Sequence, residues 1–228
     1  MTFYVLAGIA YLFSLVVKKK LDATYRKWGS VRNSAGITGA GTARRILDAN
    51  EMQRVPVEAV AGKLSDHYDP RSKTLRLSEA VYATPSVASL AIAAHEAGHA
   101  IQDHVDYGPM EIRTFSVPIA NAGARFGLPA AIAGSFLGVP WLVQVGVLAY
   151  VGALLLQFLT LPVEFNASKR ALQQVETLHL VDETEEEGAR SVLRAAAMTY
   201  VAGVASSAGY IIYLALVGGR SLLRKPRV

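Results

Sequence analysis

The sequence predicts a mainly α-helical integral membrane protein with about four transmembrane helices and a small α+β lobe. Hydrophobic residues make up 52% of the 228 residues, and the mean hydropathy is +0.29. The apolar residues gather into three runs that contain no charged residue, at residues 1–17, 126–163 and 195–219. Residues 18–114 have a mixed composition instead, which is typical of a folded lobe outside the bilayer.

The first apolar run, residues 1–17, is predicted to be transmembrane helix 1. No basic segment precedes it, and no clean small-residue cleavage site follows it. Its positive charges come afterwards, at Lys18, Lys19 and Lys20. A cleavable signal peptide has the opposite order, so we expect this segment to be a retained anchor.

The lobe, residues 18–114, is predicted to contain one helix and two extended stretches before its last helix. The helix is expected over residues 37–50, with Thr38 as its N-cap. The extended stretches are residues 55–63 and 73–78. Residues 66–72 between them contain Asp-Pro and Ser, which favour a turn.

The last helix of the lobe carries the most informative motif of the chain, His95-Glu96-Ala97-Gly98-His99. Thr84 and Pro85 resemble an N-cap and a first helical residue, and apolar residues then repeat at helical spacing. Residues four apart share one face of a helix, so both imidazoles can bind one metal ion while Glu96 reaches its water. The motif therefore predicts a zinc hydrolase centre.

A catalytic zinc ion takes three protein ligands and keeps a position for water. The candidates for the third ligand are the remaining histidines and a distant carboxylate, and we select Glu164. Pro162 suits the start of a helix, Glu164 falls in its first turn, and Ser168 lies one turn further on the same face. The alternative interpretation is that Glu164 is only a carboxylate favoured at the beginning of a helix.

Residues 115–161 are predicted to form a transmembrane helical hairpin. The charge-free run 126–163 would extend about 57 Å as one helix, against about 30 Å for a hydrocarbon core. A single crossing would also separate Glu164 from the two histidines. Two crossings that reverse near residues 138–140 solve both problems, and they enclose Asn121 and Arg125.

Three further segments are predicted after the hairpin. Residues 162–194 contain the helix with Glu164 and the start of the following helix, where Thr184 and Glu187 have the spacing of a capping box. Residues 195–219 are predicted to be transmembrane helix 4, and residues 220–228 a basic tail.

Taken together, the motifs resemble those of the gluzincin metallopeptidases, and most closely the YugP-type family of membrane zinc metallopeptidases. The resemblance covers nearly the whole chain and rests on five segments, residues 64–71, 75–78, 95–102, 161–165 and 197–201. It implies a zincin-like lobe and one Zn²⁺ per chain, bound by His95, His99 and Glu164 with Glu96 as general base. It also implies that the strand before the zinc helix is an edge strand that holds an extended peptide.

One position departs from the wider membrane gluzincins. Ser168 stands where they have an aspartate. A carboxylate–histidine contact therefore cannot be carried over to this chain.

The chemistry that we expect is amide hydrolysis. Glu96 accepts a proton from water and returns it to the leaving amine. The oxyanion needs a second donor, for which Tyr200 is the first candidate and Arg194 and His67 are the next. Tyr200 could equally be an interfacial aromatic residue, and His67 a turn-stabilising histidine.

The expected partners are the lipid bilayer and a protein or peptide substrate associated with it. Basic residues near the span ends number eleven on the side of the lobe and four on the other, which favours a multi-pass cell-membrane protein with a cytoplasmic catalytic side. The net charge of +5 suits anionic headgroups. Aromatic and basic residues are not interleaved, so nucleic acid is not an expected partner.

Two other classes of function are weighed against hydrolysis. In a zinc-stabilised membrane scaffold or chaperone, the same ligands and a fourth, such as His67 or His104, would form a closed site that has no need of Glu96. A transporter would require acidic residues or histidines within its spans, and only Asn121 and Arg125 interrupt them.

Overall fold

The computed structural model describes the backbone of residues 2–222 and the side chains of residues 8, 9 and 11–206. The chain divides into two compact units, which we call the apolar unit and the sheet unit. The apolar unit contains Met1–Val17, Arg113–Thr160 and Thr199–Val228. The sheet unit contains Lys18–Ile112 and Leu161–Met198.

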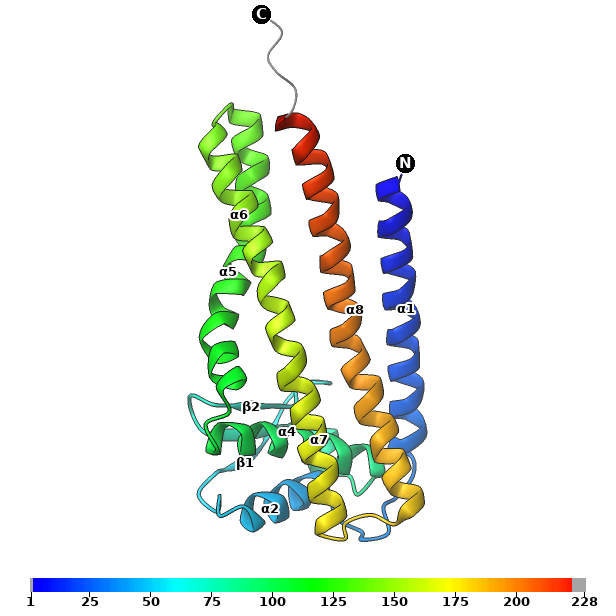
Figure 1. Cartoon of the computed structure of the whole chain (residues 1–228). Helices are drawn as coiled ribbons and strands as arrows, with labels where there is room; N and C mark the ends of the chain where they lie inside the picture. The colour runs from blue at the N-terminus through cyan, green and yellow to red at the C-terminus, as the bar shows by residue number, and fades with distance from the viewer. Residues whose placement is uncertain (1, 223–228) are drawn as a thin grey trace, which may run out of the picture. The chain divides into compact units, whose positions relative to one another are not determined.

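The described chain is mostly helical, with one small sheet of three strands (Figure 1). The elements in chain order are α1 (Thr2–Gly29), α2 (Gly39–Ala49), β1 (Val57–Val60), β2 (His67–Asp69), β3 (Thr74–Ser78), α3 (Glu79–Ala83), α4 (Val87–His104), α5 (Gly108–Leu137), α6 (Pro140–Leu156), η1 (Gln157–Leu159), α7 (Thr160–Thr177) and α8 (Glu183–Leu222).

The sheet has the order β1-β3-β2, with β1 parallel and β2 antiparallel to β3. Leu75 and Leu77 point to the same face of β3 and are fully buried. Arg76, between them, points to the other face and bonds to Glu58 on β1 at 3.1 Å. The alternation of apolar and charged residues therefore fixes which face of β3 enters the core.

The expectation that the strand before the motif helix lies at an edge is wrong. β3 is the central strand, and the edge nearest α4 is β2. The difference arises in residues 66–72, where the sequence predicts a turn and where His67–Asp69 instead pairs with β3. Three residues are too few for an alternating pattern to reveal a strand.

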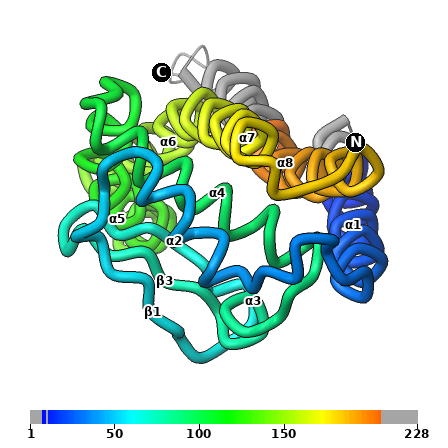
Figure 2. The backbone as a smooth tube through the Cα atoms, turned by 90° about the horizontal axis from the view of Figure 1, so that it is seen from below, coloured from blue at the N-terminus to red at the C-terminus, as the bar shows by residue number. Residues whose placement is uncertain are grey.

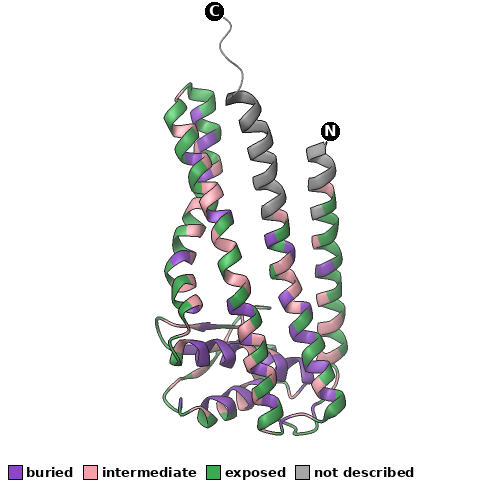
Figure 3. Cartoon of the chain, in the orientation of Figure 1, coloured by how far each residue is buried: buried purple, intermediate pink, exposed green. Residues whose placement is uncertain are grey.

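Helix α4 forms the core of the sheet unit. It packs against α2, α3, β2 and β3 (Figure 2), and most of its side chains are buried (Figure 3). Leu90 and Ala91 are fully buried on it, as are Ile46 and Leu47 of the neighbouring α2. A helix enclosed in this way holds its polar side chains in fixed positions.

The helix starts differ in part from the sequence prediction. The N-cap Thr38 is confirmed, because its Oγ1 accepts a hydrogen bond from the backbone N–H of Gly41. The cap predicted at Thr84 is wrong, since Thr84 ends α3 and Ser86 caps α4. The short helix α3 uses the residues before Thr84 and moves the start of α4 along the chain.

The predicted capping box of α8 is displaced by two residues. Asp182 accepts a bond from the backbone N–H of Glu185, and the Glu185 carboxylate accepts one from the backbone N–H of Asp182. Glu185 also accepts bonds from the backbone and hydroxyl of Ser34. This contact favours the box at Asp182 and Glu185 over the one expected at Thr184 and Glu187.

Helices α5 and α6 of the apolar unit form a hairpin. The chain reverses at Gly138, whose φ of +64° lies in the left-handed region that glycine tolerates best. The helices touch backbone to backbone, because a Cβ on Gly146 would lie 2.5 Å from the nitrogen of Ala131. Large apolar side chains remain exposed on both helices (Figure 3), among them Phe136, Trp141 and Leu148.

The expectation of about four transmembrane helices is wrong. Among the described residues, one helical stretch, Pro140–Thr177, is long and apolar enough to cross a membrane, judged by length and composition alone. Helix α5 falls short because Pro118, Asn121, Arg125 and Pro129 lower its hydropathy.

Some of the predicted spans lie partly beyond the described side chains. This is the case for residues 1–17 and 195–219. Residues 223–228 of the predicted basic tail lie outside the described residues altogether.

Candidate metal centre

The motif helix places two histidines and a glutamate at the middle of α4. The helix begins after Ser86, whose hydroxyl accepts a bond from the backbone N–H of Ser89 at 3.1 Å. His95 and His99 lie one turn apart, with ring centroids 4.7 Å apart and nearly perpendicular planes. His99 and Glu96 are buried and His95 is half-buried, so the side chains have little freedom.

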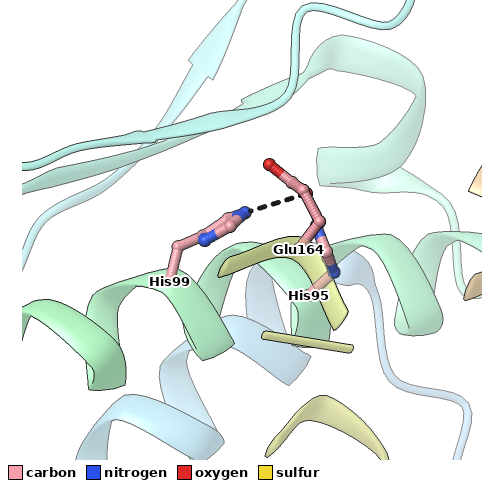
Figure 4. A group of neighbouring side chains, drawn as sticks. All are labelled: His95, His99 and Glu164. Atoms are coloured by element: carbon pink, nitrogen blue, oxygen red, sulfur yellow. Dashed lines mark hydrogen bonds and ion pairs between the residues drawn. The ribbon is translucent and has the colours of Figure 1, made fainter. Parts of the chain in front are cut away.

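Glu164 of α7 completes the group (Figure 4). Its Oε2 lies 3.2 Å from Nε2 of His95 and 3.5 Å from Nε2 of His99. The three ligand atoms all lie within 4.8 Å of one another. Within the described part of the chain, this is the group of histidine and acidic side chains that could hold a metal ion.

The spacing and the chemistry of these donors fit zinc. Nitrogen and oxygen ligands lie about 2.0–2.2 Å from zinc, so two ligands of a tetrahedral ion are about 3.3–3.6 Å apart. The separations of 3.2 and 3.5 Å agree with that geometry. Two imidazoles and one carboxylate are also a common ligand set of catalytic zinc.

Each imidazole has a polar neighbour at its other nitrogen. Nδ1 of His95 lies 3.2 Å from the hydroxyl of Ser168, and Nδ1 of His99 lies 3.0 Å from Oε1 of Gln102. When Nδ1–H donates to these oxygens, Nε2 keeps its lone pair for the metal. Gln102 Oε1 can only accept, so it selects this tautomer of His99, and the hydroxyl of Ser168 can accept from the same tautomer of His95.

Gln102 also connects the two helices of the centre. Its side chain is fully buried. Its amide nitrogen donates to the carbonyl of Val163 at 2.8 Å and to Oδ1 of Asn166 at 3.0 Å. The bonds of one side chain thus hold His99 in register with the segment of α7 that carries Glu164.

Glu96 faces the edge strand of the sheet. Its Oε2 accepts a hydrogen bond from the backbone N–H of Tyr68 at 3.1 Å. Tyr68 is anchored in turn, because its hydroxyl donates to Asp103 at 2.7 Å, and Lys73 bonds to the same oxygen. Burial and the hydrogen bond to Asp103 raise the pKa of Tyr68 above its ordinary value, so the phenol stays neutral and remains a donor.

The two helices meet without side chains between them at Gly98. A Cβ on Gly98 would lie 2.6 Å from the carbonyl oxygen of Ala167. Any residue other than glycine would therefore force α4 and α7 apart. Because Glu164 precedes Ala167 by one turn, this contact determines how near the carboxylate comes to the histidines.

The other candidate residues lie in different surroundings. The metal-binding group of the described residues includes neither His67 nor His104. His67 is exposed, and its Nδ1 lies 2.7 Å from the carbonyl of Ser65, as expected for a turn-stabilising histidine. Arg194 is exposed on α8 of the sheet unit, whereas Tyr200 belongs to the apolar unit.

Three residues of the site were missed in the sequence. Gln102 could have been found, since it follows His99 by three residues and so shares its helix face. Asn166 follows Glu164 by two residues, and no spacing rule indicates its bond to Gln102. The contact of Tyr68 with Glu96 uses the main chain, which leaves no signal in residue types.

Comparison with known proteins gives concordant results. The family model described as "Putative neutral zinc metallopeptidase" matches residues 3–218. The "Putative membrane protease YugP" of Bacillus subtilis (strain 168) is 41% identical over 202 residues, which cover 89% of this chain and 90% of that protein. No solved structure matches the chain. The resemblance to YugP-type proteins is thereby confirmed.

Replacement of Gly98 by alanine is expected to weaken the metal centre. The added methyl group cannot fit beside Ala167, and overpacking of this kind costs about 1–3 kcal/mol. We expect a lower melting temperature and less zinc per purified chain, measured by atomic emission. Gly29→Ala is the matched control, because a Cβ there meets nothing within 4 Å. Wild-type zinc content in Gly98→Ala would contradict the role of this contact.

Proposed function

The chain belongs to the family described as putative neutral zinc metallopeptidases, and on that premise we propose that it is a membrane-associated endopeptidase of the gluzincin type. One observation carries the proposal. His95, His99 and Glu164 converge at zinc-ligand spacing, with the carboxylate of Glu96 on the same helix. We assign one Zn²⁺ per chain to these three ligands.

In this proposal the residues divide the chemistry of amide hydrolysis. Zinc, when bound, supplies a Lewis acid that acidifies water and shares the charge of the oxyanion. Glu96 takes the proton of the attacking water and returns it to the leaving amine. The backbone N–H of Tyr68 holds the Glu96 carboxylate, so that this base is oriented before substrate arrives.

The proposed substrate is an extended segment of a membrane or membrane-proximal protein. Strand β2 is an edge of the sheet, and the hydrogen bond from Tyr68 to Glu96 places this edge beside the proposed general base. A peptide can add to such an edge through main-chain hydrogen bonds, which recognise backbone rather than sequence. Nucleic acid is not proposed as a partner.

Membrane association is supported by composition and by the relative. Pro140–Thr177 has a mean hydropathy of 2.0 in its most apolar window, and 17% of that window is buried. The Bacillus relative is named a membrane protease. Basic residues, Lys169 and Arg170, follow the charge-free run 126–163, which favours a cytoplasmic position for the sheet unit.

The identity of the oxyanion donor is a separate proposal. Tyr200 is the first candidate, since a neutral phenol can donate to the developing charge. Arg194 and His67 are the alternatives.

A closed structural zinc site is the less favoured alternative. Such a site has four protein ligands. The group found among the described residues has three, and Glu96 is not one of them. We therefore prefer hydrolysis to a non-catalytic scaffold.

The roles of the site residues can be separated by substitution. Glu96→Gln should keep zinc and lose at least about 10²-fold in turnover of a membrane-tethered reporter peptide, the range for loss of a general base. Glu164→Gln and His95→Ala should instead lose zinc. Glu79→Gln, an exposed carboxylate on α3, is the control and should change neither. Full turnover by Glu96→Gln would contradict the proposed mechanism.

Tyr200→Phe tests the oxyanion donor. Removal of one preorganised donor should lower kcat by about 10²-fold and leave zinc content unchanged. Steady-state kinetics on the same reporter provide the measurement. A near-normal kcat would exclude Tyr200 and direct the test to Arg194→Ala and His67→Ala.

The orientation can be tested by thiol labelling, because the chain contains no cysteine. Ser72→Cys and Ser191→Cys place single thiols at exposed positions of the sheet unit. Both should resist an impermeant maleimide on intact cells and react after permeabilisation. Labelling of intact cells at both positions would place the site on the outer face and leave the zinc ligands unaffected.

A further inference from the structure

A groove of about 510 Å³ lies between α7 and α8 in the sheet unit. The two helices run side by side in both views of the chain (Figures 1 and 2). The residues that matter here are Phe165, Ser168, Lys169, Leu172, Arg194 and Met198. Ser168 is also the hydrogen-bond partner of His95, so one end of the groove adjoins the metal centre.

The charges of the groove are unbalanced. At the far end Arg190 bonds to Glu176 at 3.3 Å and to Glu186 at 2.6 Å, so two carboxylates offset that cation and leave a local charge of −1. Lys169 and Arg194 also line the groove. Neither forms an ion pair with any residue of the described chain. Two unmatched cations in a partly apolar groove favour an anionic ligand.

The bond between Arg190 and Glu176 sets the register of the two antiparallel helices. Ser168 precedes Glu176 by eight residues, and Met198 follows Arg190 by eight, so these two residues lie level. By the same count Arg194 lies level with Leu172. Leu172 is one turn, or about 6 Å, from Ser168 along the groove.

The distance of about 6 Å indicates which residue of a bound peptide would lie beside the cations. An extended chain advances about 3.3 Å per residue, so 6 Å corresponds to about two residues. A bond broken at the metal centre would thus leave a residue about two or three positions away beside Arg194, while Lys169, which directly follows Ser168, lies nearer to that bond along α7. Leu172 and Met198 offer apolar surface for the intervening side chain.

We propose that the groove binds the substrate on one side of the scissile bond and that Lys169 and Arg194 select a carboxylate about two or three residues from that bond. This inference rests on the proposed peptidase function and deepens it. It assigns Arg194 to substrate recognition instead of the oxyanion. The carboxylate can be an aspartate or glutamate side chain or a free C-terminus, since both present the same group.

A peptide library tests the proposal. The zinc-loaded full-length protein in detergent micelles is incubated with the library, and cleavage sites are read by mass spectrometry. Aspartate or glutamate should be enriched two or three positions from the cleaved bond, on one side. In matched single peptides, Glu should exceed Gln at that position by about tenfold or more in kcat/KM, as expected for a charge-assisted bond. Comparison of amidated with free C-termini distinguishes the two sources of carboxylate.

Charge reversal distinguishes recognition from a structural effect. Arg194→Glu and Lys169→Glu should lose the preference for Glu and gain one for Lys, with zinc content unchanged. A variant that is merely damaged would not gain activity on the Lys peptide. Arg45→Glu on α2 is the control, an exposed cation outside the groove, and should keep the wild-type preference.

Each outcome decides a separate point. Cleavage with equal rates for the Glu, Gln and Lys peptides would overturn the groove proposal and leave the peptidase intact. Absence of all cleavage would contradict the proposed function. The groove proposal would then be tested by binding to zinc-loaded Glu96→Gln, and equal affinities for the Glu and Gln peptides would contradict it. A further outcome is that Arg194→Glu binds phosphatidylglycerol vesicles more weakly than the wild type does and yet keeps the preference for the Glu peptide. In that case the cations bind lipid phosphates and the proposal is wrong.

Discussion

The metal centre depends on the direct contact between the backbones of α4 and α7 at Gly98 and Ala167. His95 and Glu164 are 69 residues apart in the chain, and the apolar hairpin α5–α6 lies between them. Local sequence can place the two histidines on one helix face, but only this packing brings the carboxylate to them. Glycine permits the approach because it has no Cβ to meet the carbonyl of Ala167.

The ligands and their polar contacts near that packing site set the charge that a bound metal ion would keep. The three ligands carry one negative charge, so a bound Zn²⁺ would keep a net charge of +1, which favours the acidification of water. Ser168 and Gln102 are neutral partners of the imidazoles. A carboxylate at position 168 would make His95 a stronger base, and the serine leaves more positive charge on the metal.

Features that depend on residue spacing within one element are predictable from the sequence. Two imidazoles and Glu96 lie on one helix as the motif requires, and the Thr38 cap and the reversal at Gly138 arise from local residue preferences. The predictions fail where tertiary contacts decide. Ser86 caps α4 because α3 takes the residues before it, and β2 exists because it pairs with β3. The number of spans is overestimated because charge-free length takes no account of the polar residues and prolines of α5.

The site has two different sides, to which we assign the two halves of one peptide. Glu96 touches Tyr68 of the edge strand, while His95 touches Ser168 at the mouth of the groove. In our proposal the edge would recognise main chain and so tolerate many sequences, whereas Lys169 and Arg194 of the groove would recognise one charge. Since Ser168 belongs to both the groove and the metal centre, a peptide in the groove would press on the residue that orients His95. In this proposal, recognition and metal geometry would be coupled through that serine.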